Sequence, residues 1–322
     1  MADILNFIIN FSAVLWEAMP FVILGAVIAG ILEELLPQQL LTKMLPKSVL
    51  PAVMIGGMLG LLFPMCECGI VVVMRRLLRK GLPLSCCIAY MLAGPIVNGV
   101  VIFSTWVAFR DHKIAPEMVG LRVGMGFLVA VVTGLIVHRS YKKYGNALLT
   151  PVAAPPSLPM ADEPEAAGEK KTLGKRLGNI SSTAIHDFVD IMVFLIAGAA
   201  IAAFVKLHIT TGQIKSMSQE QPYLMIPAMM GLSFLMCLCS EADAFVAASF
   251  TTMHHSAKLA FLVLGPMLDI KLVLMYTRVF RLRLILTIVA CVVVQVLLYC
   301  VILHAVYNAN GWSGLPPSAV TG

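Results

Sequence analysis

The chain has 322 residues, of which 59% are hydrophobic and only 12% are charged, and its formal net charge is +6. The mean hydropathy is +0.91, far from that of an average soluble domain. This composition excludes a soluble enzyme or a nucleic-acid-binding module. It predicts an all-α integral membrane protein whose surroundings are the lipid bilayer.

Apolar stretches long enough to cross a hydrocarbon core of roughly 30 Å recur along the chain. Six are uninterrupted and lie near residues 4–32, 84–108, 119–139, 185–206, 259–277 and 284–306. Two more, Leu50 to Leu78 and Pro222 to Met253, are each interrupted at a Cys-x-Cys motif. We therefore predict about eight transmembrane helices, four in each half. A re-entrant course of the interrupted stretches would change this count.

The two Cys-x-Cys motifs belong to an internal repeat with an offset of 171 residues. The same offset carries Gly94-Pro95 to Gly265-Pro266 and Asn98 to Asp269. A register that holds over this distance indicates duplication. We predict a first transmembrane repeat at 1–143 and a second at 181–322. An even number of crossings in each would give both halves the same orientation, related by an axis along the membrane normal.

Between the halves, residues 144–180 offer no apolar face. This segment carries five prolines (Pro151, Pro155, Pro156, Pro159 and Pro164) among alanine, glutamate and lysine residues. Such a composition is typical of a flexible linker. Basic residues flank it and also follow the first motif, and short basic loops stay cytoplasmic. The prediction is therefore a cytoplasmic linker, with both chain termini in the cytoplasm. Arg278, Arg281 and Arg283 oppose this orientation, because eight crossings would leave them outside.

The interrupted helices are the strongest indication of function. Unpaired backbone groups at membrane depth are tolerated only where protein or a water-filled cavity surrounds them, and such breaks mark binding sites in transporters. A short helix begins after each motif, and a helix N-terminus favours thiolate over thiol. Thiolates select copper(I), zinc and other thiophilic species. We therefore interpret Cys66, Cys68, Cys237 and Cys239 as candidate metal ligands. The alternative is that they are small buried hydrophobes, which is our interpretation of the other four cysteines.

Polar residues inside the apolar stretches are the next candidates, because ionisable groups in a bilayer are costly and usually functional. Asn98 and Asp269 each lie three residues after a proline, and each proline frees the carbonyl four residues before it. Glu67 lies between the two thiols of its motif. Glu241 and Asp243 follow the second motif, where helix capping is the alternative explanation.

These motifs resemble a family of predicted permeases that includes the organoarsenical efflux permease ArsP and a branch assigned to copper and zinc efflux. The segments that carry the resemblance are Pro64 to Gly69, Arg79-Lys80-Gly81, Gly94-Pro95, Cys237 to Phe245 and Gly265-Pro266. The resemblance implies a multi-pass exporter of the bacterial inner membrane that confers resistance to a thiophilic toxicant. Arsenical members have a small uncharged residue between the first two cysteines. Glu67 at that position favours a cation.

We therefore predict an efflux permease for a soft metal or metalloid, such as copper, zinc or trivalent (organo)arsenicals. It would work by alternating access, with proton coupling as a hypothesis. No phosphate-binding loop and no haem, flavin or quinone motif is recognisable, so we expect neither an enzyme nor a cofactor. One alternative is a membrane thiol-disulfide oxidoreductase, in which the two dithiols pass electrons. Another is a structural or assembly subunit, and homo-oligomerisation is compatible with each.

Overall fold

The computed structural model describes residues 2–35, 46, 48–63, 65–110, 114–151, 173–208, 222–251 and 253–311. Within these ranges the chain folds into helices without a β-strand, apart from one isolated bridge between Leu149 and Phe280. The all-α prediction is confirmed for the described part of the chain. Most of the predicted linker lies outside it.

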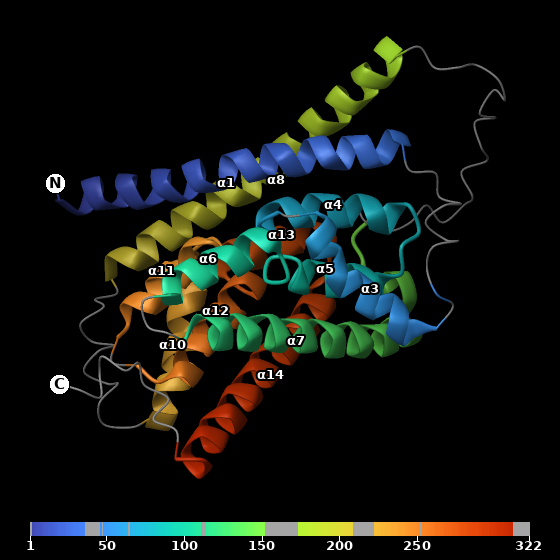
Figure 1. Ribbon diagram of the computed structural model, residues 1–322. Coiled ribbons are helices and arrows are strands. Elements are labelled where there is room, and N and C mark those ends of the chain that lie inside the picture. The colour runs from blue at the N-terminus through green and yellow to red at the C-terminus, as the bar shows by residue number, and fades with distance from the viewer. Residues whose placement is uncertain are drawn as a thin grey trace.

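The helices of the first half are α1 (Ala2–Leu35), α3 (Val49–Leu62), α4 (Glu67–Arg79), α5 (Leu84–Ala93), α6 (Gly99–Phe109) and α7 (Ala115–Tyr144), followed by the 3-10 turn η2 (Gly145–Leu148). Those of the second half are α8 (Leu173–His208), α10 (Pro222–Met236), α11 (Ala242–Ser249), α12 (His255–Met267), α13 (Ile270–Val279) and α14 (Leu282–Ala309) (Figure 1). Helix α8 begins inside the segment predicted as linker. Helices α8, α12 and α13 begin 171 residues after α1, α5 and α6, which is the offset of the sequence motifs.

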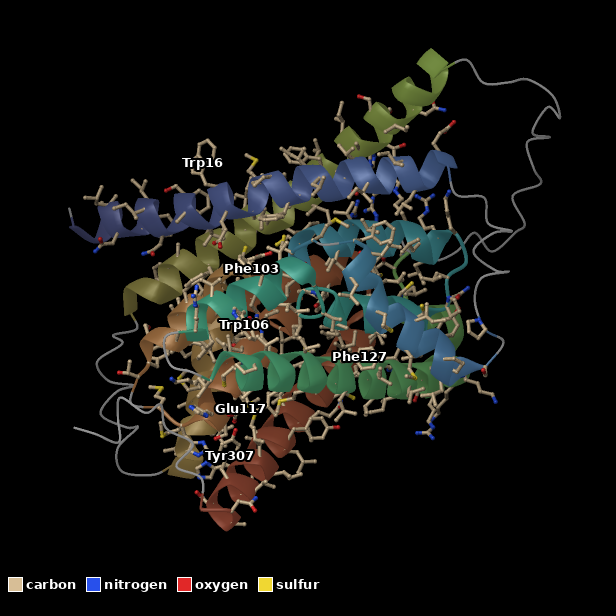
Figure 2. All side chains as sticks on the ribbon, viewed as in Figure 1. Trp16, Phe103, Trp106, Glu117, Phe127 and Tyr307 are labelled. Carbon is tan, nitrogen blue, oxygen red and sulfur yellow. The ribbon has the colours of Figure 1, made fainter. Side chains whose placement is uncertain are left out.

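Five described segments are long and apolar enough to cross a bilayer: Ile4–Leu32, Ala115–Leu148, Gly178–Phe204, His255–Val279 and Leu282–Ala309. Large apolar side chains cover their outer surfaces. Trp16, for example, is 79% exposed and projects away from the bundle (Figure 2). Such surfaces match the hydrocarbon tails of lipids, and the protein is therefore a multi-pass membrane protein, as its composition predicts.

The two halves run in opposite directions, contrary to our prediction. Figure 1 shows α1 running from the N label toward the far side of the bundle, while α8 returns from that side. Side-chain contacts agree. Asn179, near the start of α8, lies 3.5 Å from Glu34 at the end of α1, and Ile180 lies against Gly30. The repeats are therefore inverted. The prediction of equal orientation was wrong because it counted each interrupted stretch as one full crossing.

Helices α3 and α4 form a hairpin that returns to the side from which it starts. Helix α3 lies parallel to α5, since Gly56 is against Cys86 and Gly60 is against Gly94. The start of α3 is therefore level with Leu84, the first residue of α5. Helix α4 ends at Arg79, only a short turn before Leu84, so it ends at that same level. The interrupted stretch enters the bundle and leaves again.

The following stretch passes through the whole bundle. Helices α5 and α6 lie antiparallel along α7, with Ser85 against Gly134, Ile96 against Gly126, and Thr105 bonded to Arg122. The chain breaks between α5 and α6 but keeps its direction. The break at Asn98 therefore lies at the depth where the α3–α4 hairpin turns, because Asn98 contacts Met65.

The two ends of the bundle differ in charge. We call one end the basic face. There Lys80 donates a hydrogen bond to the Leu32 carbonyl (2.7 Å), and Arg281 donates one to the Leu149 carbonyl (3.2 Å). Arg283 lies there over the ring of Tyr144. The arginines after α13 thus share a face with the basic residues that end α4 and α7. The conflict in the sequence-based orientation disappears.

We call the opposite end the histidine face. There the Nδ1 atoms of His254 and His304 lie 3.2 Å apart, and His255 lies 4.0 Å from Glu117. Figure 2 shows Glu117 and Tyr307 at this end. Burial and the neighbouring His304 lower the pKa of His254 to about 4, so this imidazole is neutral at physiological pH.

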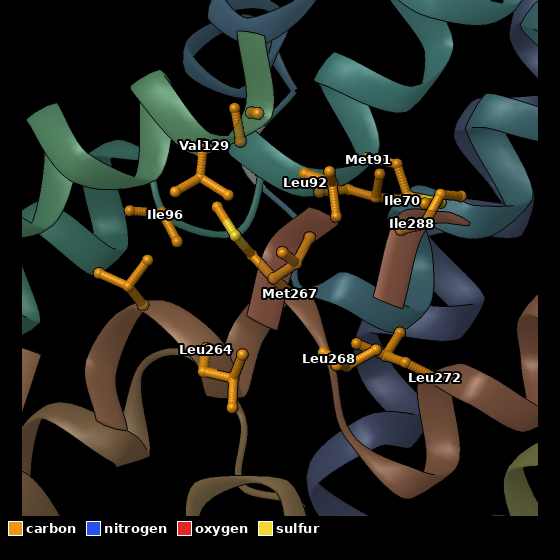
Figure 3. Packing of buried hydrophobic residues seen from close by; sticks show 14 of the residues in the cluster. Ile70, Met91, Leu92, Ile96, Val129, Leu264, Met267, Leu268, Leu272 and Ile288 are labelled. Atoms are coloured by element: carbon orange, nitrogen blue, oxygen red, sulfur yellow. The ribbon is translucent and has the colours of Figure 1, made fainter. Parts of the chain in front are cut away.

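Apolar packing fixes the central breaks in place. Figure 3 shows Met267, at the break between α12 and α13, on the side of Ile96 and Val129, and Leu268 beside Leu272. Met267 is fully buried and Leu268 is 2% exposed. The non-helical backbone is therefore enclosed by protein, as backbone at membrane depth requires.

The contact between α1 and α4 gives a first prediction. A Cβ atom added at Gly25 would lie 2.8 Å from the Gly69 Cα and 2.9 Å from its carbonyl oxygen, and backbone atoms cannot yield easily. We expect Gly25→Ala to destabilise the protein by about 1–3 kcal/mol through overpacking. Thermal unfolding in detergent measures this. The control is Gly124→Ala on α7, where nothing lies within 4 Å and alanine improves helix propensity. Equal melting temperatures for the two variants would contradict the close contact.

Candidate functional site

The starts of α4, α6, α11 and α13 all lie in the interior and carry the residues that sequence analysis selected. Cys66 is the N-cap of α4, and Cys68 lies in its first turn. Asn98 caps α6 by accepting from the Val100 N–H (2.9 Å), and Asp269 caps α13 by accepting from the Leu272 N–H (2.7 Å). Glu241 precedes α11. Cys237 has φ +49°, a left-handed conformation that ends the preceding helix.

Thiols from the two halves meet at this level. The Cys66 thiol lies beside the thiols of Cys239 and Cys68, close enough for the groups to interact. The Cys237 thiol lies instead 3.6 Å from the Phe234 carbonyl of its own helix. All four cysteines are buried and none forms a disulfide. The structure thus brings three of the four predicted ligands together and leaves the fourth turned away.

These thiols do not form a finished metal centre. Among the described residues, no group of three or more His, Cys, Asp or Glu side chains is arranged to hold a metal ion. An ion at the thiols would therefore require side-chain rotation, with Cys237 turning from the Phe234 carbonyl.

A buried ionic group lies beside the thiols. The Lys271 ammonium is 2.8 Å from Glu67 Oε1, 3.4 Å from Asp269 Oδ2 and 3.3 Å from the Cys237 carbonyl oxygen. The side chains of all three charged residues are at most 2% exposed. The single positive charge of Lys271 can neutralise only one of the two carboxylates. The N-terminal dipoles of α4 and α13 stabilise the remaining negative charge. Sequence analysis selected both acids but missed Lys271.

Asn98 touches the same region through a long contact, 3.5 Å from its Nδ2 to the Met65 carbonyl oxygen. Its main observed role is the α6 cap. Glu241 is half-buried, with its carboxylate 3.4 Å from the Ser240 hydroxyl and within electrostatic range of Glu67 and Glu17. Both residues therefore border the thiols and the ionic group without bonding to them in this structure.

Asp243 binds an arginine of the first half, whereas helix capping was the alternative considered for it. It does not cap α11, which has no side-chain cap. Instead it accepts from Arg122 of α7 at 2.8 and 3.0 Å, and the same guanidinium donates to the Ser240 carbonyl (2.9 Å). Arg122 and Asp243 are both buried. This pair fastens the start of α11, and so the second motif, to the first half.

A further ionic cluster joins the halves at the basic face. Asp187 accepts from Arg75 and, at 2.7 and 2.9 Å, from Arg76. Asp190 accepts from Arg75 and Arg278, each at 3.0 Å. The aspartates lie on α8, far from its first turn. Sequence analysis missed the cluster, although two acids inside an apolar stretch were a signal of buried pairing.

The family model described as "Predicted permease", ArsP_1, matches residues 3–305. The chain belongs to the ArsP_1 predicted permease family. It is similar to "UPF0718 protein YcgR" of Bacillus subtilis (strain 168), with 37% identity over 289 residues, which cover 89% of this chain and 93% of the relative. It is also similar to a protein of Streptococcus mutans serotype c described as "Putative two-component membrane permease complex subunit", with 30% identity over 302 residues, or 94% and 96% of the two chains. No solved structure matches the chain.

Membership of this family and the apolar helices identify a membrane transporter. The thiols, the ionic group and the breaks all lie where α4 of the first half meets α11 and α13 of the second. In inverted-repeat transporters this is where substrate sites are found.

Proposed function

We propose that this ArsP_1 permease exports a thiophilic metal or metalloid cation through a site formed by Cys66, Cys68, Cys239 and, after rotation, Cys237. The observation that carries the proposal is the contact between the Cys66 and Cys239 thiols, because it unites motifs that are 171 residues apart. Soft thiolates select ions such as copper(I) and zinc, and trivalent arsenic is also thiophilic. Glu67 and Asp269 beside the thiols favour a charged substrate over a neutral arsenical.

Alternating access is the proposed mechanism. The inverted halves, residues 1–143 and 181–322, share the site and would rock about it. Ions would bind from the cytoplasm and leave on the other side as protonation weakens their ligands. Proton coupling rests on the buried acids Glu67 and Asp269.

Binding of cadmium, a thiophilic probe, to purified full-length protein tests the site. We expect one ion per chain, with the ultraviolet absorption of a cadmium–thiolate bond. Cys66→Ser should remove that absorption and weaken binding at least tenfold. Cys86→Ser, a buried cysteine outside the site, should leave both unchanged. Equal effects of the two substitutions would show that the motif cysteines are packing residues.

We further propose a topology of six crossings and two re-entrant hairpins. In the first half, α1, α5–α6 and α7 cross, and α3–α4 returns to the basic face. In the second half the corresponding segments cross in the opposite sense. Helix α10 follows the end of α8, and α11 leads into α12 at the histidine face, so this hairpin enters from that face. The basic face is then cytoplasmic, which places the outer ends of α1 and α14 outside, contrary to our sequence-based orientation.

Labelling with a membrane-impermeant thiol reagent tests this topology. Native cysteines in the described residues are buried or half-buried, whereas Arg110 and Lys143 are exposed at opposite ends of the bundle. Arg110→Cys should react in intact cells, and Lys143→Cys only after permeabilisation. The reverse pattern would place the basic face outside.

The rival activity is thiol-disulfide exchange, which the neighbouring Cys66 and Cys239 thiols could also support. It predicts a change in thiol redox state without movement of any ion across a vesicle membrane.

As for assembly, the Streptococcus relative is described as a complex subunit. That description supports association of this chain with a second subunit or with further copies, which the molar mass of the detergent-solubilised protein would reveal.

A further inference from the structure

The Lys271 ammonium lies in a cage of three oxygen atoms from different elements. Glu67 Oε1 comes from α4, Asp269 Oδ2 from the cap of α13, and the third is the Cys237 carbonyl oxygen at the left-handed turn after α10. Carboxylate and carbonyl oxygens are ligands for cations. The protein's own ammonium occupies this position.

The cage holds the ammonium by charge more than by directed hydrogen bonds. Among the described residues, Glu67 Oε2 has no donor, and the only partner of Glu67 Oε1 and Asp269 Oδ2 is the Lys271 ammonium. An unsatisfied buried carboxylate oxygen is costly. These lone pairs are therefore available to a cation that approaches from the adjacent thiols. A lysine ammonium is a compact charge on a flexible stem, so it can withdraw.

The cage also lies on the boundary between the halves. Glu67 belongs to the first half and Lys271 to the second, so their ion pair ties together the two bodies that alternating access must move. Lys271 is packed against α8 as well, since its Cα is 2.7 Å from the position that a Cβ on Gly198 would take. Any displacement of the ammonium therefore changes a contact at the moving interface.

We propose that Lys271 is a specificity-determining residue that acts as a tethered cation beside Glu67 and Asp269, and that the transported cation displaces its ammonium from Glu67. This inference rests on the proposed export function. A cation replaces the lost charge at Glu67 and frees the two halves to move. An uncharged arsenical cannot compensate Glu67 in this way. The cage thus selects a cation from among the thiophilic species that the cysteines would accept.

Cadmium titration of full-length protein in detergent tests the proposal. Lys271→Met removes the competing ammonium, so the dissociation constant should fall at least tenfold. The loss of a positive charge would also make the site attract cadmium more strongly, even if cadmium displaces no ammonium in the wild type. The double variant K271M/D269N therefore restores the net charge of the group. It should still bind more tightly than the wild type if displacement occurs, and it provides the test if Lys271→Met alone does not fold.

The matched control is Lys258→Met, which removes another fully buried lysine, one that lies near Phe109 at the histidine face. Its dissociation constant should equal that of the wild type. An unchanged constant for K271M/D269N would overturn the tethered-cation proposal and leave only electrostatic attraction. Absence of cadmium binding by the wild type would instead contradict the proposed function, so the two failures are distinguishable.

Discussion

Asp187→Ala should destabilise the protein by about 3–5 kcal/mol, because it removes the buried carboxylate that two buried guanidinium groups share. The Asp187 side chain has no exposed surface, and it accepts hydrogen bonds from both Arg75 and Arg76. The cluster joins the end of α4 to α8, so the loss should also loosen the two halves at the basic face. Thermal and denaturant unfolding in a single detergent would measure the change.

Arg79→Ala is the control, since this neighbouring arginine is exposed. Removal of an exposed charge is expected to change stability by no more than about 0.5 kcal/mol. Asp190→Ala should fall between the two, because the Asp190 side chain is 21% exposed and water can replace part of its role. Equal stability of the Asp187 and Arg79 variants would show that the cluster does not hold the halves together.

Oxidation that links Cys66 to Cys239 should abolish transport almost completely, and a reductant should restore it. The two thiols lie side by side, so a disulfide forms once the side chains reach bonding geometry. Such a bond would covalently fix α4 of the first half to the turn before α11 of the second, and rocking of the halves would stop. Vesicle uptake before and after treatment with a mild oxidant and then dithiothreitol measures the effect.

A variant that retains Cys66 and Cys239 but has serine at positions 68 and 237 identifies the bond. Proteolysis and mass spectrometry should recover the two segments as one linked peptide. Cys239→Ser should prevent this particular link. Full transport by protein whose Cys66–Cys239 link is complete would show that the halves do not move apart at this point.

Sequence patterns alone predicted much of this molecule. The Cys-x-Cys offset anticipated the recurrence of the helix starts. The stretches 84–108 and 259–277 were predicted as uninterrupted, whereas the structure breaks them before Asn98 and Asp269, and the preceding prolines were the local signal of those breaks. Such signals exist in a sequence because prolines and helix-capping residues act locally on the backbone. The apolar stretches likewise indicate membrane helices, since the bilayer imposes their length.

The direction of the halves could not be obtained in the same way. A stretch that enters and leaves a membrane has the composition of one that crosses it. Only the pairing of α3 with α5, through Gly56 and Gly60, distinguishes the two. Arg278, Arg281 and Arg283 had already conflicted with eight crossings, and that conflict was the available signal.

The ionic partners were missed for a related reason. Arg122 and Lys271 each lie in an apolar stretch, which marks a buried ionisable residue, but the acids that join them to the other half are 121 residues away at Asp243 and 204 residues away at Glu67. Local patterns do not pair residues over such distances. As a result, Asp243 was interpreted as a possible cap or ligand, whereas it positions the second motif through Arg122. Asp269, two residues before Lys271, was a local signal that went unused.

The most direct test of the account is uptake of zinc, copper(I), arsenite and methylarsenite into inverted vesicles that contain purified protein. The comparison is a variant with Cys66, Cys68, Cys237 and Cys239 all changed to serine. We expect the wild type to accumulate a cation and the variant to accumulate none. Equal uptake by both proteins, at equal insertion, would contradict a substrate site at the meeting point of the two motifs.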